Sequence, residues 1–210
     1  MSSNELVSQA EIFIINRYAA SELAGGLIIG NMARKVSDPF LRTKLTWHCA
    51  EETRHALIWY KLIEELNIPS IEIHDSNKED YFSYIKNKVD HIIDFLACVH
   101  VYELRVPFHF GVHLKWTNNP RIQVVLKQLI KEEDSHLSWI RDYLNKELKN
   151  GNKMVSISLK KFLDIERYTY YKDLEKLEKL GNDAKEFVKH IRHDLVKFER
   201  ECENEFNQFE

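Results

Sequence analysis

A pattern of glutamates and histidines occurs twice in this chain of 210 residues, and it restricts the possible folds more than any other feature. In each copy, one glutamate precedes a Glu-x-x-His string by 30 residues. The two copies are Glu22 with Glu52-Thr53-Arg54-His55, and Glu103 with Glu133-Asp134-Ser135-His136. Every member of the second copy lies 81 residues after its counterpart. The pattern therefore predicts two copies of one helical hairpin, each with two carboxylates and one imidazole.

Helix-start signals follow the same repeat. Asp38-Pro39 and Asn119-Pro120 are also 81 residues apart, and each pairs a good N-cap residue with a proline at the first helical position. The first turn, near residue 37, is about 15 positions from both Glu22 and Glu52. At a rise of roughly 1.5 Å per residue, both carboxylates should lie about 22 Å from the turn. The same reasoning applies to the second copy, so each hairpin should hold its carboxylates at one level.

The composition favours an all-α fold. The chain contains only six glycines and four prolines, too few for the many turns of a β-fold. Apolar periodicity and helix stops predict six helices, over about 4–35, 39–66, 81–116, 120–150, 156–180 and 183–209. The connection 67–80 either joins the hairpins directly or crosses between them, and spacing leaves both open. We expect a single domain over 1–210, with a metal-binding core at about 4–150 and accessory helices at about 156–209.

Charge and cysteine content exclude several classes of protein. The net charge of −3 offers no electrostatic basis for nonspecific nucleic-acid binding. No uninterrupted apolar run reaches the ~20 residues of a membrane span, so we expect no membrane association. The polar, acidic N-terminus is not that of a signal peptide. Cys49, Cys98 and Cys202 are odd in number and widely spaced, which argues against a disulfide framework and favours a reducing, cytoplasmic location.

Metal binding is the chemistry that the duplicated pattern predicts. Residues i and i+3 share a helix face, so Glu52 points the same way as His55, and Glu133 the same way as His136. All four glutamates of the pattern project from apolar stripes, where a lone ionised carboxylate would cost several kcal/mol. Two divalent cations would offset that cost and the mutual repulsion of the carboxylates. Mixed oxygen and imidazole ligands suit iron or manganese better than calcium or magnesium.

Chance must be weighed against this reading. One Glu-x-x-His string is expected by chance in a chain rich in both residues, so a single copy means little. Two copies, each preceded by a glutamate at equal spacing, are much harder to explain as a satisfied polar core. A metal-free helical binding module remains the alternative reading.

At these residues the chain resembles the ferritin-like di-iron carboxylate superfamily, in which two helices each supply one glutamate and two others each supply Glu-x-x-His. The resemblance covers about 4–150 and implies a four-helix bundle, here with two additional C-terminal helices, and a crossover at 67–80. It implies that Glu22 and His55 hold one iron, Glu103 and His136 the other, and that Glu52 and Glu133 bridge them. The Glu-Glu-Thr-Arg-His string is similar to the second-helix motif of acyl carrier protein desaturases and rubrerythrins.

The chain differs from several subfamilies of this superfamily, and the differences limit which subfamily it resembles. The chain lacks the Cys-x-x-Cys module of rubrerythrins, is shorter than plant-type desaturases and has more helix after the core than ferritins. Its size is similar to that of small di-iron oxygenases, such as cyanobacterial aldehyde-deformylating oxygenases and tRNA-hydroxylating monooxygenases. The mild acidity makes a tRNA substrate the less expected of the two.

The resemblance implies a non-haem di-iron oxygenase or oxidase that activates O₂ and oxidises a small, apolar organic substrate. Two iron ions are expected, with manganese or a mixed Fe/Mn pair as alternatives. Electrons would come from an external ferredoxin or flavin reductase, and a homodimer is expected. The alternative function is a ferroxidase or other iron-handling protein, which would need a large hollow assembly for storage.

Several further residues have two readings each. His48, one turn before Glu52, is a possible seventh ligand, as in the p-aminobenzoate N-oxygenases that the motif also resembles, but a hydrogen-bonded core histidine is the favoured reading. His100, three residues before Glu103, has the same ambiguity. Pro107 should kink its helix, with or without opening a pocket beside the metals. Gly25-Gly26 leaves room either for a ligand or for close helix packing.

Other polar and aromatic residues have a structural reading. Arg54 and Asp134 are expected to orient a ligand or to carry charge on the opposite face. His190 and His193 are read as surface or packing residues, because no carboxylate accompanies them on an apolar face. The tyrosines at 168, 170 and 171 are expected in the core and at helix interfaces rather than around a substrate.

Overall fold

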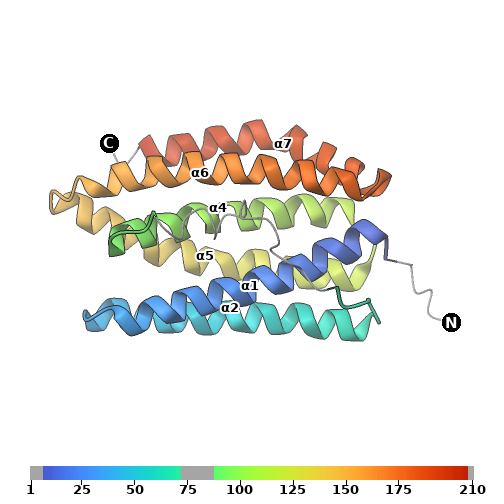
Figure 1. Cartoon of the computed structure of the whole chain (residues 1–210), viewed down its shortest axis with the longest axis horizontal. Coiled ribbons are helices and arrows are strands. Elements are labelled where there is room, and N and C mark those ends of the chain that lie inside the picture. The colour runs from blue at the N-terminus through green and yellow to red at the C-terminus, as the bar shows by residue number, and fades with distance from the viewer. Residues whose placement is uncertain (1–6, 72–87, 208–210) are drawn as a thin grey trace. The chain divides into compact units, whose positions relative to one another are not determined.

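The computed structural model describes residues 7–71 and 88–207, and all regular structure in these residues is helical. Figure 1 labels the helices. They are α1 (Gln9–Lys35), α2 (Pro39–Glu65), α4 (Ile92–Trp116), α5 (Pro120–Lys149), α6 (Met154–Leu177) and α7 (Asn182–Asn207), with a short 3₁₀ turn, η1 (Glu178–Leu180), before α7. The all-α prediction and the six predicted helices are therefore confirmed within the described ranges.

The chain divides into two compact units. The described part of the first unit comprises 7–71 and 117–129, which includes α1, α2 and the first ten residues of α5. The described part of the second comprises 88–116 and 130–207, which includes α4, the rest of α5, α6 and α7. The single domain expected over 1–210 stays a prediction.

The first unit is built on an antiparallel pair of helices, α1 and α2. The connection between them is three residues long, and the cap predicted from Asp38-Pro39 is present: the Asp38 carboxylate accepts a hydrogen bond of 2.8 Å from the Leu41 N–H. Their shared core contains Ile15, Leu45 and Trp59, all fully buried. Arg121, in the first turn of α5, forms an ion pair with Glu65 at the end of α2.

Two glycines of α1 allow that helix to lie close to α2. A Cβ added at Gly26 would lie 2.8 Å from Thr53 Cγ2 and 3.2 Å from the Thr53 backbone nitrogen. A Cβ added at Gly30 would lie 2.8 Å from Cys49 Sγ. The contact at Gly26 involves the backbone of α2 and leaves no room for a side chain, so close helix packing is the role of Gly26, whereas at Gly30 the Cys49 thiol would have to move. Gly25, the other member of the pair, has a different environment.

The second unit packs α4 against α6 and α7, which lie side by side in Figure 1. Fully buried aromatic side chains from both partners, Phe162 of α6 and Phe187 of α7, form its core. The buried Asp94 near the start of α4 accepts a 2.7 Å hydrogen bond from the Ser158 hydroxyl of α6. Burial by itself would raise the pKa of Asp94, but hydrogen bonds from Ser158 and the Asp90 N–H, with Lys161 nearby, hold it below its ordinary value.

The start of α1 differs from the prediction. The sequence predicts a helix from about residue 4, whereas residues 7 and 8 are not helical and α1 begins at Gln9. Ser8 is the N-cap, and its hydroxyl accepts a hydrogen bond of 3.2 Å from the Glu11 N–H. The predicted residues 4–6 lie outside the described part of the chain.

The start of α4 is a second difference. A helix was expected from about residue 81, but residues 88–91 form a turn and a bend, and α4 begins at Ile92. The Asp94 carboxylate accepts the Asp90 N–H at 3.2 Å, so a side chain takes a donor that a continuous helix would have used. Most of the predicted connection 67–80, and residues 81–87, lie outside the described ranges, so the choice between a direct connection and a crossover stays open.

Smaller differences occur elsewhere. The fifth predicted helix begins at Met154 rather than near residue 156, and its last predicted turn is the 3₁₀ turn η1. The last helix ends its described course at Asn207, because 208–210 are outside the described residues. The helix α4 continues through Pro107 to Trp116, so the proline does not end it.

Within residues 7–71 and 88–207, one helix, α1, is long and apolar enough to cross a membrane by length and composition alone. Half of its most apolar stretch is buried inside the structure, and the core helices of soluble proteins pass the same test. Its buried residues include Asn16 and Glu22. The helix α1 therefore contributes both apolar and polar side chains to the helical core.

Replacing Gly26 by alanine is expected to destabilise the protein, because the new Cβ would push α1 away from α2. Overpacking of this kind costs about 1–3 kcal/mol. Gly111→Ala is the matched control: its added Cβ meets nothing within 4 Å, so the better helix former should add about 0.5–1 kcal/mol. Urea unfolding would measure both. Equal midpoints for the two variants would contradict the close approach at Gly26.

Asp94→Asn is expected to cost about 1–3 kcal/mol at neutral pH, because it leaves buried hydrogen-bonding groups poorly matched. Since the folded-state pKa of Asp94 is depressed, its contribution is present above the ordinary value of 3.8 and is lost as pH falls through the folded pKa. The stability difference between wild type and variant should therefore shrink in acid. The exposed Asp142→Asn is the control. A difference that does not change between pH 7 and pH 3 would contradict this assignment.

Candidate metal centre

The first unit brings together three of the predicted ligands. Glu22 comes from α1, and Glu52 and His55 come from α2. All three are buried, with exposed fractions of 7%, 4% and 0%. The Glu22 Oε2 atom lies 3.8 Å from His55 Nδ1, so a carboxylate from one helix and an imidazole from the other meet at one level. This contact confirms the prediction that the first hairpin holds its metal-binding side chains at the same height along the two helices.

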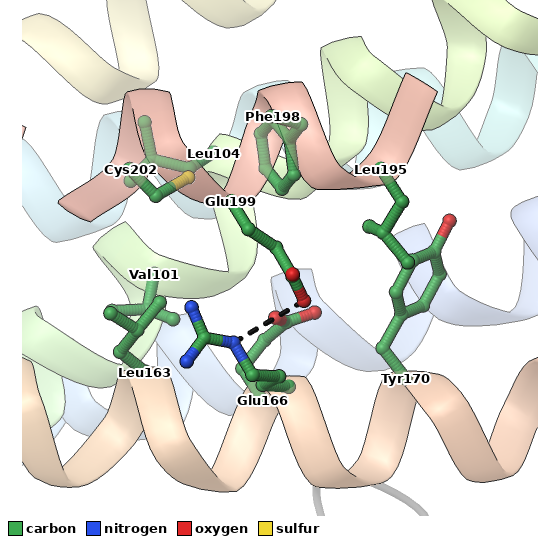
Figure 2. A pocket seen from close by; sticks show the side chains of 10 residues that line it. Val101, Leu104, Leu163, Glu166, Tyr170, Leu195, Phe198, Glu199 and Cys202 are labelled. Carbon is green, nitrogen blue, oxygen red and sulfur yellow. Dashed lines mark ion pairs between the residues drawn. The ribbon is translucent and has the colours of Figure 1, made fainter. Parts of the chain in front are cut away.

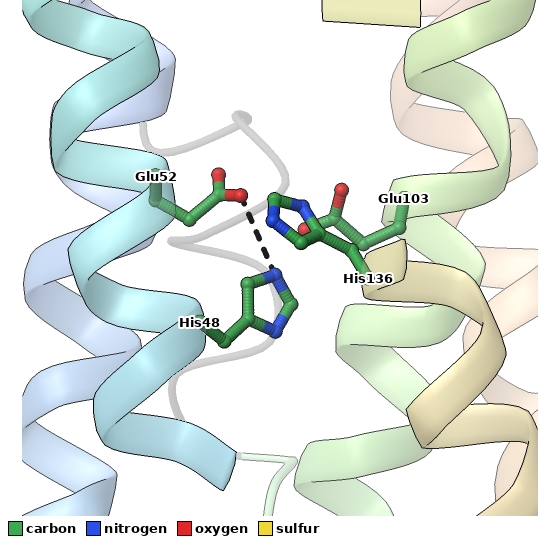
Figure 3. Close-up of side chains that lie close together, drawn as sticks. All are labelled: His48, Glu52, Glu103 and His136. Carbon is green, nitrogen blue, oxygen red and sulfur yellow. Dashed lines mark ion pairs between the residues drawn. The ribbon is translucent and has the colours of Figure 1, made fainter. Parts of the chain in front are cut away.

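His48 belongs to the same group of side chains in α2. Its ring is fully buried, and its Nε2 atom lies 3.4 Å from Glu52 Oε1, as Figure 3 shows. The two residues are one helical turn apart, so they leave α2 on the same face. Glu52 therefore has an imidazole close to it on each side along the helix, His48 before it and His55 after it.

The second unit repeats the arrangement. Glu103 comes from α4, and Glu133 and His136 come from α5; their exposed fractions are 3%, 1% and 0%. Glu133 Oε2 lies 3.0 Å from His136 Nδ1. One ligand atom of Glu103 and one of His136, both drawn in Figure 3, lie within 4.8 Å of each other. The sequence repeat is thus matched by a repeated geometry.

These distances fit atoms that share a metal ion. Two ligand atoms at about 2.0–2.2 Å from one ion lie roughly 3–4 Å apart. The separations of 3.4 Å at His48 and 3.8 Å at His55 exceed the usual N–H···O range of about 2.7–3.2 Å, whereas the 3.0 Å contact between Glu133 and His136 is a hydrogen bond. Buried histidine and glutamate groups of the described helices could therefore hold a metal ion. Their members are His48, Glu52, His55, Glu103, Glu133 and His136.

Other side chains around the donors follow the expectations only in part. Arg54 forms an ion pair with Glu51, and its guanidinium nitrogen lies 3.4 Å from His55 Nε2. With Arg54 against Nε2, the Nδ1 atom of the His55 ring lies on the side of Glu22. This arrangement fits the expectation that Arg54 orients a ligand. Asp134 is exposed, which fits a charge on the opposite face of α5. His100 is buried, but its ring packs against Phe206 at 6.2 Å and it is in neither metal-binding group.

The remaining residues singled out in the sequence lie as expected, with one exception. His190 and His193 are exposed on α7, which agrees with a surface role. Tyr170 is buried in the second unit, whereas Tyr168 is 47% exposed and is not a core residue.

A buried ion pair that the sequence did not predict lies between α4 and α6. Arg105 faces Glu166 and also stacks on the rings of Tyr102 and Tyr170, at 4.8 Å and 4.5 Å from their centroids. Burial raises the pKa of Glu166 above its ordinary value, although Arg105 acts in the opposite direction. Its only sequence signal was a charged residue, Arg105, on the apolar helix α4.

A small cavity lies next to this ion pair, among side chains of α4, α6 and α7. Figure 2 shows Glu166, Tyr170 and Glu199 at its wall. Glu199 forms an ion pair with Arg167, which also lines the cavity. Its volume is about 10 Å³, no more than one water molecule needs. The cavity is too small for an organic substrate, and the charged residues around it tie the three helices together.

Comparison with known proteins finds no match: no family model, no curated protein and no solved structure matches this chain. The evidence for the site is therefore the identity, burial and spacing of the donors themselves.

His48→Ala is expected to weaken metal binding by about 10–100-fold, whether the ring binds the metal or orients Glu52. His100→Ala is the matched control, because it removes another fully buried imidazole that belongs to neither metal-binding group. Titration with cobalt, followed by its visible absorption, measures affinity and coordination together. Equal affinity in the wild type and the His48 variant would show that His48 is an ordinary core histidine.

Proposed function

We propose that this protein is a non-haem di-iron oxygenase or oxidase that activates O₂ and oxidises a small, apolar organic substrate. One observation carries the proposal: each unit buries its own Glu-x-x-His pair beside another carboxylate, with donor atoms at separations suited to a shared ion. A polar core built for stability alone has no need to bury carboxylates beside imidazoles twice, at the same spacing.

The proposed roles of the donors follow the repeat. Glu22 and His55 would hold one iron, and Glu103 and His136 the other. Glu52 and Glu133, which share a helix face with those histidines, would supply the remaining carboxylate donors, Glu52 beside His55 and Glu133 beside His136. The two divalent cations would neutralise the four carboxylates, because their formal charges balance. Iron is favoured by the donor set, with manganese or a mixed pair as the alternative.

The surrounding side chains would control water and orientation. Trp59 and Leu45, both fully buried, lie on the apolar faces that carry Glu52 and His55 and would keep bulk water from the donors. The Arg54 guanidinium would hold the His55 ring with Nδ1 toward Glu22. When bound, two ferrous ions would supply the electrons that activate dioxygen. No residue other than the donors is assigned a catalytic role.

Several broader features belong to the same proposal. We propose a ferritin-like four-helix bundle as the fold of the metal-binding core, with α6 and α7 as the additional helices. An external ferredoxin or flavin reductase would supply electrons, and the protein would act in the cytoplasm as a homodimer. The odd, widely spaced cysteines support the reducing compartment.

Anaerobic loading with Fe²⁺ followed by a pulse of O₂ tests the proposal. We expect two irons per chain and a transient absorption band after the pulse. Glu52→Gln and His136→Ala should each abolish the band and lower the iron content, because each removes one donor. The matched control is Glu132→Gln, which alters the glutamate directly before Glu133.

Three outcomes would count against this function. Purified protein that binds no transition metal would favour the metal-free binding module. A band that survives in both donor variants would show that the metals lie elsewhere. Sedimentation as a large hollow assembly, with iron accumulating beyond two per chain, would favour the ferroxidase alternative over an oxygenase dimer.

A further inference from the structure

Gly25 differs from the other two glycines of α1. Gly26 has no room for a side chain, since an added Cβ would lie 2.8 Å from Thr53 Cγ2 and 3.2 Å from the Thr53 backbone nitrogen, and at Gly30 the Cys49 thiol would have to move. At Gly25, the added Cβ would meet a single atom within 4 Å, the Glu52 Oε2 atom, at an ordinary contact distance of 3.5 Å. Alanine would fit at position 25 without moving either helix.

Packing therefore does not require the absence of a side chain at Gly25. Glycine is less favourable than alanine in a helix interior, so a glycine where alanine fits lowers stability. Residues held at such a cost are often found where function needs space. The one atom that a side chain at position 25 would approach belongs to a proposed metal ligand.

Gly25 has a specific position relative to the predicted metal-binding residues of the first unit. Gly25 follows Glu22 by one turn of α1, so both lie on the face that carries the donors. Glu22 lies against the Nδ1 atom of His55. Glu52 presents Oε1 toward His48, whereas Oε2 is the atom closest to the empty side-chain position of Gly25. The open position thus lies beside a carboxylate oxygen and next to the helix turn that supplies Glu22.

We infer that Gly25 keeps open the position at which a small exogenous ligand, of the size of a dioxygen molecule, reaches the metal centre beside Glu52. Gly25 is then a specificity-determining residue, because the size of its side chain limits what can approach the centre from α1. The inference rests on the proposed function, since the ligand binds the metals that Glu22, Glu52 and His55 hold.

Nitric oxide is a suitable probe, because it is diatomic and binds ferrous iron without turnover. We expect Gly25→Ala to keep the full iron content, since its Cβ makes only an ordinary contact with Oε2. Its affinity for nitric oxide, measured by optical titration and electron paramagnetic resonance, should fall about tenfold or more, and that of Gly25→Val further, because the new side chain overlaps the ligand. Gly25→Ala should also melt at a higher temperature than the wild type.

The matched controls are Gly111→Ala and Gly111→Val. They make the same changes at a helical glycine with open space around it, where no metal donor lies within 4 Å of the added Cβ. Both should bind nitric oxide like the wild type. A loss of ligand affinity together with a gain in thermal stability, confined to the Gly25 series, is a combination that a purely structural role of Gly25 does not produce.

Two results would overturn the inference. One is wild-type affinity for nitric oxide in Gly25→Ala and Gly25→Val when both hold normal iron. The other is loss of iron already in Gly25→Ala, which would mean that position 25 serves the donors and not a ligand. Wild-type protein that binds no iron would instead refute the proposed function and, with it, this inference. If Gly25→Val fails to fold, the alanine variant alone decides.

Discussion

The burial of carboxylates beside imidazoles is the constraint on which the rest of this structure depends. Glu22, Glu52, Glu103 and Glu133 are each at least nine-tenths buried, in helices whose neighbouring residues are apolar. An ionised carboxylate in such surroundings is unfavourable by several kcal/mol unless a cation or hydrogen bonds compensate it. The long helices, their caps and the close approach of α1 to α2 bring imidazoles to these carboxylates, and the donor spacing they create suits metal ions.

The ion pair between Arg105 and Glu166 shows the alternative solution to the same problem. There, a buried carboxylate faces a guanidinium that also stacks on Tyr102 and Tyr170, so the charge is compensated within the protein. Within each unit, the predicted metal-binding carboxylates instead lie beside imidazoles of modest basicity. The carboxylate of Glu166 thus needs no external cation. The arrangement of the other four buried glutamates, by contrast, favours a bound cation. This contrast supports a metal-binding reading over a generally polar core.

The start of a helix could be predicted from the sequence where a short local motif is sufficient to begin the helix. Asp38-Pro39 and Asn119-Pro120 begin α2 and α5 as expected, because cap and proline act within four residues. The start of α4 was not predictable, since the Asp94 carboxylate that accepts the Asp90 N–H is also held by Ser158 of α6, 64 residues away. The buried Arg105–Glu166 pair was missed for the same reason: its partners meet only when α4 packs on α6.

The sequence by itself determined the helical class and which buried glutamates and histidines could hold a metal ion, because helical periodicity and an 81-residue repeat are local or nearly local properties. Only the tertiary structure decided how each donor is surrounded. Packing of α1 on α2 distinguished Gly26, which has no room for a side chain, from Gly25, which faces Glu52, although the two are adjacent glycines. Packing also placed His48 against Glu52 and turned His55 toward Glu22. These distinctions depend on which atoms of another helix arrive at each face, and no single-helix pattern contains that information.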